Sequence, residues 1–183
     1  MTSTQPATAP ALEQLLKGAA LAGEWTLDPA RSAVSLHSRS IGGLVRVNGV
    51  FRDVSGEGSV SASGEVSGTI TVAAASVDTK NARRDAHLRS ADFFDSDTHP
   101  DITFTVSGIR PAGQGVTVTG ALTVRDCARP LAFDSTAVVQ ENAEVRLDAE
   151  VDVNRADFGL TWNRLGLVSM ENTIAVHAVF TRR

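Results

Sequence analysis

Apolar and polar residues alternate along most of the chain from Trp25 onward. In the clearest segment, threonines separate Ile102, Phe104 and Val106. A period of two places the apolar side chains on one face of an extended strand. The pattern recurs in segments 34–36, 70–74, 102–106, 116–124, 145–153 and 174–180. We therefore predict an all-β fold of about eight antiparallel strands, each with one apolar and one polar face.

Clusters of glycine, proline and asparagine separate these segments and mark the turns between strands. They fall at residues 42–43, 55–58, 111–115 and 141–142. Antiparallel strands in series with polar outer faces predict a sandwich or a closed barrel. We favour the barrel, because closure removes the edges that long, regular strands would otherwise expose. A barrel of about eight strands is either filled by side chains or holds one small ligand.

The chain before the first strand has a different pattern. Residues 1–10 are rich in Thr, Ser, Pro and Ala, which is typical of a disordered terminus. Further on, Leu12, Leu15, Leu16 and Leu21 fall at approximately helical spacing. We therefore expect residues 1–22 to be an extension with a short amphipathic helix that packs on the domain or on a partner. Residues 23–183 then form one barrel domain.

One stretch interrupts the period of two and predicts a short helix over residues 81–91. Asn81 can cap the first turn of this helix. Asp85 and Arg89 are placed to form an i,i+4 ion pair. Phe93 and Phe94 follow directly and require burial. A helix and two aromatic rings at one end of a barrel would act as a lid or a floor.

The charged residues of this stretch allow several interpretations. A catalytic site would use His87 with Asp85 or Asp92, but no activated serine or cysteine accompanies them in the sequence. A metal site would join His87 and His99 to nearby aspartates, although such residues are more often solvated or paired. The other interpretations are a salt-bridged structural helix and a polar ring around a ligand headgroup. We assign no catalytic residues and no metal ligands.

A second dense segment, residues 154–163, follows a long alternating strand. Its polar residues can form local hydrogen bonds at a bend, and its apolar residues then resume the alternation. This arrangement would place aromatic side chains in a barrel lumen beside polar residues at the rim. The polar residues are Asn154, Arg155 and Asp157, and the apolar residues are Phe158, Leu160 and Trp162.

Composition and charge narrow the function classes. A formal net charge of -4 provides no broad positive field, so we do not expect nucleic-acid binding. Cys127 is the single cysteine, which excludes an intrachain disulfide and a cysteine-based zinc site. The N-terminal residues lack the basic region of a secretory signal, and no apolar run approaches the roughly 20 residues of a transmembrane helix. We therefore expect a cytoplasmic protein.

These segments resemble a known family. The stretches DAHLRSADFFD (85–95), HPDITF (99–104) and NRADFGLTWN (154–163) are similar to the signature stretches of the YceI-like family of polyisoprenoid-binding proteins. The segments WTLDPARS (25–32) and VNGVF (47–51) resemble its opening strand and next turn. The resemblance implies a lipocalin-like barrel whose lumen holds a polyisoprenoid lipid or an isoprenoid quinone, with the headgroup near the opening. It implies no other cofactor.

The resemblance, read with the residue pattern, gives a set of site residues. The expected lumen residues are Phe93, Phe94, Phe104, Leu122, Phe133, Phe158, Leu160 and Trp162. The expected polar residues, near the headgroup or locking the helix to the barrel, are Arg84, His87, Arg89, Asn154, Arg155 and Asp157. We expect a non-enzymatic lipid carrier. The alternatives are an enzyme on an apolar substrate with His87 as base, and a packed interaction module, for example a homodimer.

Overall fold

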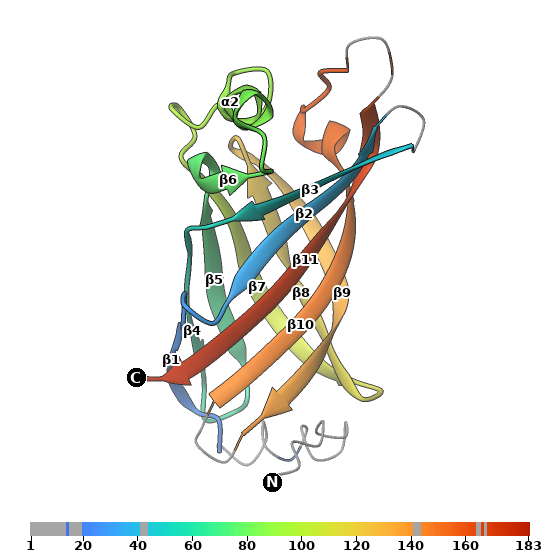
Figure 1. The fold of residues 1–183 in the computed structure, drawn as a ribbon. Coiled ribbons are helices and arrows are strands. Elements are labelled where there is room, and N and C mark those ends of the chain that lie inside the picture. Colours follow the sequence, from blue (N-terminus) through green and yellow to red (C-terminus); the bar gives the residue numbers. More distant parts are fainter. Residues whose placement is uncertain (1–13, 15–19, 41–43, 141–143, 164–165, 167) are drawn as a thin grey trace, which may run out of the picture.

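The computed structural model describes residues 14, 20–40, 44–140, 144–163, 166 and 168–183. Its sheet is antiparallel throughout and closes on itself, because the last strand pairs back with the first, with Trp25 opposite Arg182 (Figure 1). The closed ring runs in the order β1 (Gly23–Leu27), β4 (Val54–Val60), β5 (Val66–Ala73), β7 (Asp101–Ala112), β8 (Gly115–Val124), β9 (Cys127–Val139), β10 (Glu144–Asn154) and β11 (Val168–Arg182).

Three further strands extend this ring at the end of the barrel that lies at the top of Figure 1, which we call its upper end. They are β2 (Ala33–Ser40), β3 (Val45–Phe51) and β6 (Val77–Asp78). Strand β11 pairs with β1 near its C-terminal end and with β2 nearer its N-terminal end, so β1 and β2 form one interrupted strand. The same relation joins β3 to β4, and β5 to β6 through the 3-10 helix η1 (Ala74–Ser76). The prediction of an eight-stranded barrel is confirmed.

The turn predicted at residues 55–58 is wrong, because this segment lies inside β4. The glycines of this segment allow β4 to pack closely against β5. A Cβ atom on Gly58 would lie 3.0 Å from the backbone oxygen of Ser67 on β5. The turn at 111–115 is confirmed as the hairpin between β7 and β8. The predicted turns at 42–43 and 141–142 lie outside the described residues, and so do Leu12, Leu15 and Leu16.

The interrupting helix is α2 (Ala82–Arg89). Its predicted cap is confirmed, because the side chain of Asn81 accepts a hydrogen bond from the Arg84 backbone N–H at 3.0 Å. The predicted ion pair between Asp85 and Arg89 is wrong. Asp85 is buried and accepts from the Thr79 backbone N–H at 2.9 Å. Arg89 instead donates to the backbone oxygens of η1 and β6, because these carbonyls need partners where the sheet is interrupted.

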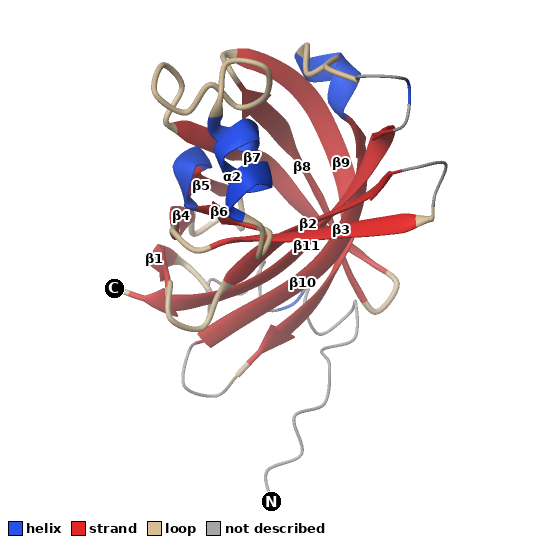
Figure 2. Cartoon of the chain, turned by 45° about the horizontal axis from the view of Figure 1, so that its top comes forward, coloured by secondary structure: helices blue, strands red, loops and turns tan. Residues whose placement is uncertain are grey.

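The barrel wall is incomplete at its upper end. Pairing of β5 with β7 stops at Ala73 and Asp101, and pairing of β9 with β10 stops at Ser135 and Ala149. Helix α2 lies in the connection from β5 to β7, where the first pairing stops. The 3-10 helix η2 (Arg155–Phe158) directly follows β10, where the second pairing stops. Both helices lie at the same end of the barrel (Figure 2).

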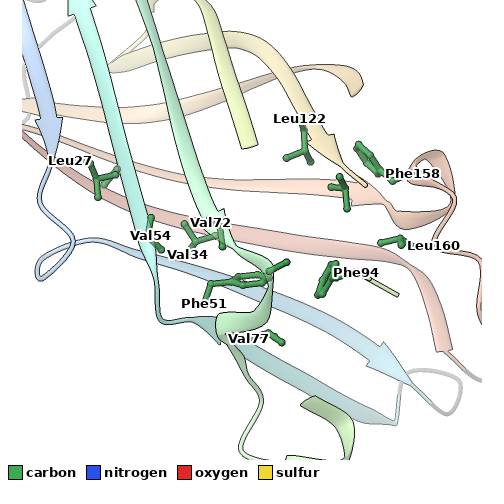
Figure 3. Packing of buried hydrophobic residues seen from close by; sticks show 13 residues of the cluster. Leu27, Val34, Phe51, Val54, Val72, Val77, Phe94, Leu122, Phe158 and Leu160 are labelled. Atoms are coloured by element: carbon green, nitrogen blue, oxygen red, sulfur yellow. The ribbon is translucent and has the colours of Figure 1, made fainter. Parts of the chain in front are cut away.

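The apolar residues of the strands point into the barrel and form two clusters. In the larger cluster, Phe51, Val77 and Phe94 lie on one side in Figure 3, and Leu122 and Phe158 lie on the other. Many other inward residues, including Leu36 and Ile174, are only half-buried. The interior is therefore only partly filled by side chains. None of the described helices is long and apolar enough to span a membrane.

Candidate functional site

A cavity of about 360 Å³ occupies the upper half of the barrel. Its wall is made by inward side chains of strands from both sides of the barrel, together with residues that follow α2 and η2. The structure places all eight predicted lumen residues at this wall. They are Phe93, Phe94, Phe104, Leu122, Phe133, Phe158, Leu160 and Trp162. Their contact with a ligand stays a prediction.

The residues after η2 line the cavity although they do not form a strand. The predicted return to a strand is wrong, because the chain is irregular from Leu160 to Asn163. Leu160 is instead fixed by its backbone, whose N–H donates to the Arg155 carbonyl at 3.1 Å. Phe158 and Leu160 are both buried as a result. The same side chains thus face the lumen for a local reason that differs from the predicted one.

The two segments singled out by the sequence meet at the upper end of the cavity. The ring of His87 on α2 packs edge-on against Trp162, with 4.3 Å between centroids, and against Phe93, with 5.2 Å. The rings of Phe93 and Trp162 are 5.7 Å apart. We call His87, Phe93 and Trp162 the mouth cluster. It joins the α2 region to the η2 region across the open end of the lumen.

Arg155 is the buried cation of the site, with 6% of its surface exposed. Its Nε donates to the Ser169 carbonyl at 3.0 Å, and Nη1 donates to the Leu160 carbonyl. Its Nη2 is buried and has no hydrogen-bond partner among the described residues. The guanidinium lies 5.5 Å from the centre of the Phe93 ring and lines the cavity. Burial lowers the pKa of Arg155, since removal from water disfavours the charged form.

The other predicted polar residues divide into two groups. Arg84 lines the cavity, but its guanidinium is bound to the hydroxyl and carbonyl oxygens of Thr79 at 2.7 and 2.9 Å. Arg89, Asn154 and Asp157 do not line the cavity. Asn154 caps η2 by accepting from the Ala156 N–H at 2.9 Å, and the Asp157 side chain is exposed. Arg89 and Asn154 are therefore structural locks.

A second cavity of about 140 Å³, which the sequence pattern did not predict, lies in the lower half of the barrel. Leu21 and Trp25 contribute to its wall, and both are buried. Leu21 precedes the first strand, so the alternation of apolar and polar residues did not predict that it faces the lumen. The alternation did place Val145 and Phe180 on apolar faces, and both line this cavity.

The geometry of the site gives little support for catalysis. The His87 imidazole lies 3.3 Å from the Asp92 carboxylate, and no hydrogen bond joins it to a hydroxyl or thiol in the part of the chain that the structure describes. Within the same residues, no group of three or more potential ligands is arranged to hold a metal ion. The site is an apolar cavity with one buried cation and an aromatic cluster at its mouth.

Comparison with known proteins identifies the family of this domain. Residues 25–180 match the model of the YceI-like domain. A UPF0312 protein of Pectobacterium carotovorum is 35% identical over 107 residues, which cover 56% of this chain and 55% of that protein. Protein YceI of Escherichia coli is 32% identical over 107 residues, 56% of each chain. The matched region thus spans little more than half the length of these relatives.

Solved structures share the fold over a larger part of the chain. Burkholderia cenocepacia BcnA has a TM-score of 0.75 and 28% identity, covering 84% of this chain and 98% of that one. A polyisoprenoid binding domain from Saccharophagus degradans, implicated in plant cell wall breakdown, has a TM-score of 0.70 at 17% identity, covering 87% and 98%. The Campylobacter jejuni YCEI protein has a TM-score of 0.61 and 26% identity, covering 74% and 86%.

The family match begins within β1 and ends within β11, and it includes both segments that form the mouth of the lumen. The chain therefore belongs to the YceI-like family.

Proposed function

We propose that this protein binds an amphiphilic lipid of the polyisoprenoid or isoprenoid-quinone type and holds it without chemical change. The apolar tail occupies the barrel lumen, and the polar headgroup lies at the mouth. The observation that carries this proposal is the combination of a 360 Å³ apolar cavity with a buried arginine whose Nη2 has no partner within the described structure.

The apolar lining suits a tail without hydrogen-bonding groups. Burying one methylene group contributes about 0.8 kcal/mol, so a few isoprene units offset the entropy lost when a flexible chain is ordered. The half-buried lumen residues, such as Ile174, keep apolar surface that a tail would cover. The wall would therefore recognise the shape and length of the tail more than its chemistry.

The headgroup end suits a group with acceptor oxygens. A buried donor without a partner is costly, so Nη2 of Arg155 would gain by contacting a phosphate or a quinone oxygen. His87 and Trp162 line the same cavity and pack against Phe93, the ring that the Arg155 guanidinium also faces. Arg155, His87 and Trp162 are our proposed headgroup contacts.

The choice of binding over catalysis rests on the cavity of this chain. The domain from Saccharophagus degradans is described as polyisoprenoid binding, and at 17% identity it supports the fold of this chain alone. The cavity lining of this chain carries the argument for a lipid. A cytoplasmic location and a homodimer stay predictions.

Mass spectrometry of lipid extracted from gently purified protein tests the proposal. Ile174 lines the upper cavity, so Ile174→Trp should fill it and abolish the bound lipid. Ala175 precedes the next lumen residue on β11 and does not line the cavity, so Ala175→Trp is the matched control and should keep the lipid. Equal lipid content in both folded variants, or wild-type protein that neither carries nor takes up lipid, would contradict the proposal.

A further inference from the structure

The two cavities of the barrel meet at a narrow ring of side chains. Four residues line both cavities: Ile70 on β5, Phe104 on the neighbouring strand β7, Phe133 on β9 and Val176 on β11. We call these four residues the waist. Above it lies the 360 Å³ cavity, the upper chamber, and below it lies the 140 Å³ cavity, the lower chamber.

The two aromatic rings of the waist have defined positions. The centroids of Phe104 and Phe133 are 5.4 Å apart, and their planes are tilted by 49°. The ring of Phe104 lies directly against Gly120 on β8, where a Cβ atom would come within 2.7 Å of it. Because glycine leaves room at the wall, this ring lies against the strands and narrows the lumen without filling it.

The lower chamber is limited at its other end by Leu21, which precedes β1, and by Trp25 within β1. The indole N–H of Trp25 donates to the Leu21 carbonyl at 2.9 Å, and Arg182 donates to the Ala20 carbonyl. The Arg182 guanidinium also lies 5.1 Å from the centre of the Trp25 ring. These contacts from both ends of the chain fix Leu21 and Trp25, which are 6% and 5% exposed, as the floor.

The volumes of the chambers set a length for the tail. A dry apolar cavity of about 150 Å³ holds one benzene molecule, or about 25 Å³ per carbon. On this scale the upper chamber takes about fourteen carbons and the lower chamber about six. Those numbers correspond to about three isoprene units and about one isoprene unit.

We infer that the lower chamber is a separate subsite for the last isoprene unit of a tail of about twenty carbons. This inference rests on the proposed function and adds the length of the tail to it. A tail of about fifteen carbons fills the upper chamber alone. The next unit passes the waist beside the packed pair of Phe104 and Phe133, on the side of Val176, and the floor stops further growth inward. Longer tails must leave their extra units outside the mouth.

Titration of the protein with prenyl diphosphates of increasing length tests this inference. Dissociation constants would be measured for tails of about 10, 15, 20 and 40 carbons. The affinity should rise from the shortest tail to the twenty-carbon tail, with roughly a tenfold or larger gain in the last of these steps. It should not rise further with the longest tail, since no lumen volume remains for it.

A pair of variants assigns the last gain to the lower chamber. Ala149 lines only the lower chamber, so Ala149→Phe should remove the gain from fifteen to twenty carbons and leave the affinity for the fifteen-carbon tail unchanged. Ala132 is exposed on β9 and lines neither chamber, so Ala132→Phe should behave like the wild type.

The outcomes separate the inference from the function on which it rests. If no prenyl compound of any length binds, the proposed function fails. If the fifteen-carbon tail binds and the twenty-carbon tail binds no better, the subsite is wrong and lipid binding stands. A gain that survives in folded Ala149→Phe protein also overturns the subsite.

Discussion

Arg155 offers the sharpest test of how the headgroup is held. Replacing it by methionine keeps a long side chain in the cavity wall but removes the guanidinium. A hydrogen bond to a charged group contributes about 1.5 to 3 kcal/mol, which corresponds to a roughly 10- to 150-fold change in affinity. Because Nη2 is buried without a partner in the described structure, a headgroup oxygen would gain this full interaction.

The assay compares three ligands with the same tail: a diphosphate, a quinone and a hydrocarbon without acceptor oxygens. Arg155→Met should weaken the ligand whose headgroup contacts Nη2 by about 10- to 150-fold and change hydrocarbon binding little. A loss confined to the diphosphate or to the quinone would also identify the headgroup class.

Arg89 provides the matched control for this substitution. Its guanidinium also donates to two backbone carbonyls, those of Ala75 and Val77, but it does not line the cavity. Arg89→Met should therefore lower the free energy of unfolding without changing ligand selectivity. The reasoning is refuted if Arg155→Met weakens all three ligands equally, or if Arg89→Met reproduces its selectivity.

Three further predictions concern stability. Asn81→Ala removes the α2 cap and should lower the free energy of unfolding by about 0.5 to 2 kcal/mol in urea titrations. Gly120→Ala would place a methyl group 2.3 Å from a backbone oxygen on β7, so its unfolding midpoint should fall well below that of wild type. The Lys80 backbone N–H and the Arg52 guanidinium hold the pKa of Asp78 well below 3.8, so this carboxylate stabilises the fold above pH 3.8 and less below it. The melting temperatures of wild type and Asp78→Asn should therefore differ at neutral pH and converge as the pH falls below 3.8, and a constant difference would contradict this origin.

Part of the candidate site could be read from local patterns. The lumen positions of Phe104, Leu122 and Phe133 follow from alternation, because successive residues of a strand point to opposite faces. The α2 cap at Asn81 follows from the preference of asparagine for helix starts. The many charged residues in the segment 81–95 correctly predicted that the alternation of the barrel strands is interrupted there.

Other features depended on contacts between distant residues. The sequence could not show that Arg89 donates to η1 and β6 and does not pair with Asp85. The acceptor carbonyls lack strand partners only because the sheet is interrupted there. Nor could it assign Leu21 to the floor, since that position depends on Trp25 and on the pairing of the first and last strands.

The sequence by itself determined the all-β class, the direction in which most strand side chains point and the break at α2, because each depends on neighbours within a few residues. Only the tertiary structure decided how full the interior is. The empty volume, the waist at Phe104 and Phe133 and the buried Nη2 of Arg155 arise where side chains from separate strands meet around a closed ring. Alternation fixes which side chains face inward, whereas the circumference of the barrel and the size of opposing residues fix the space between them.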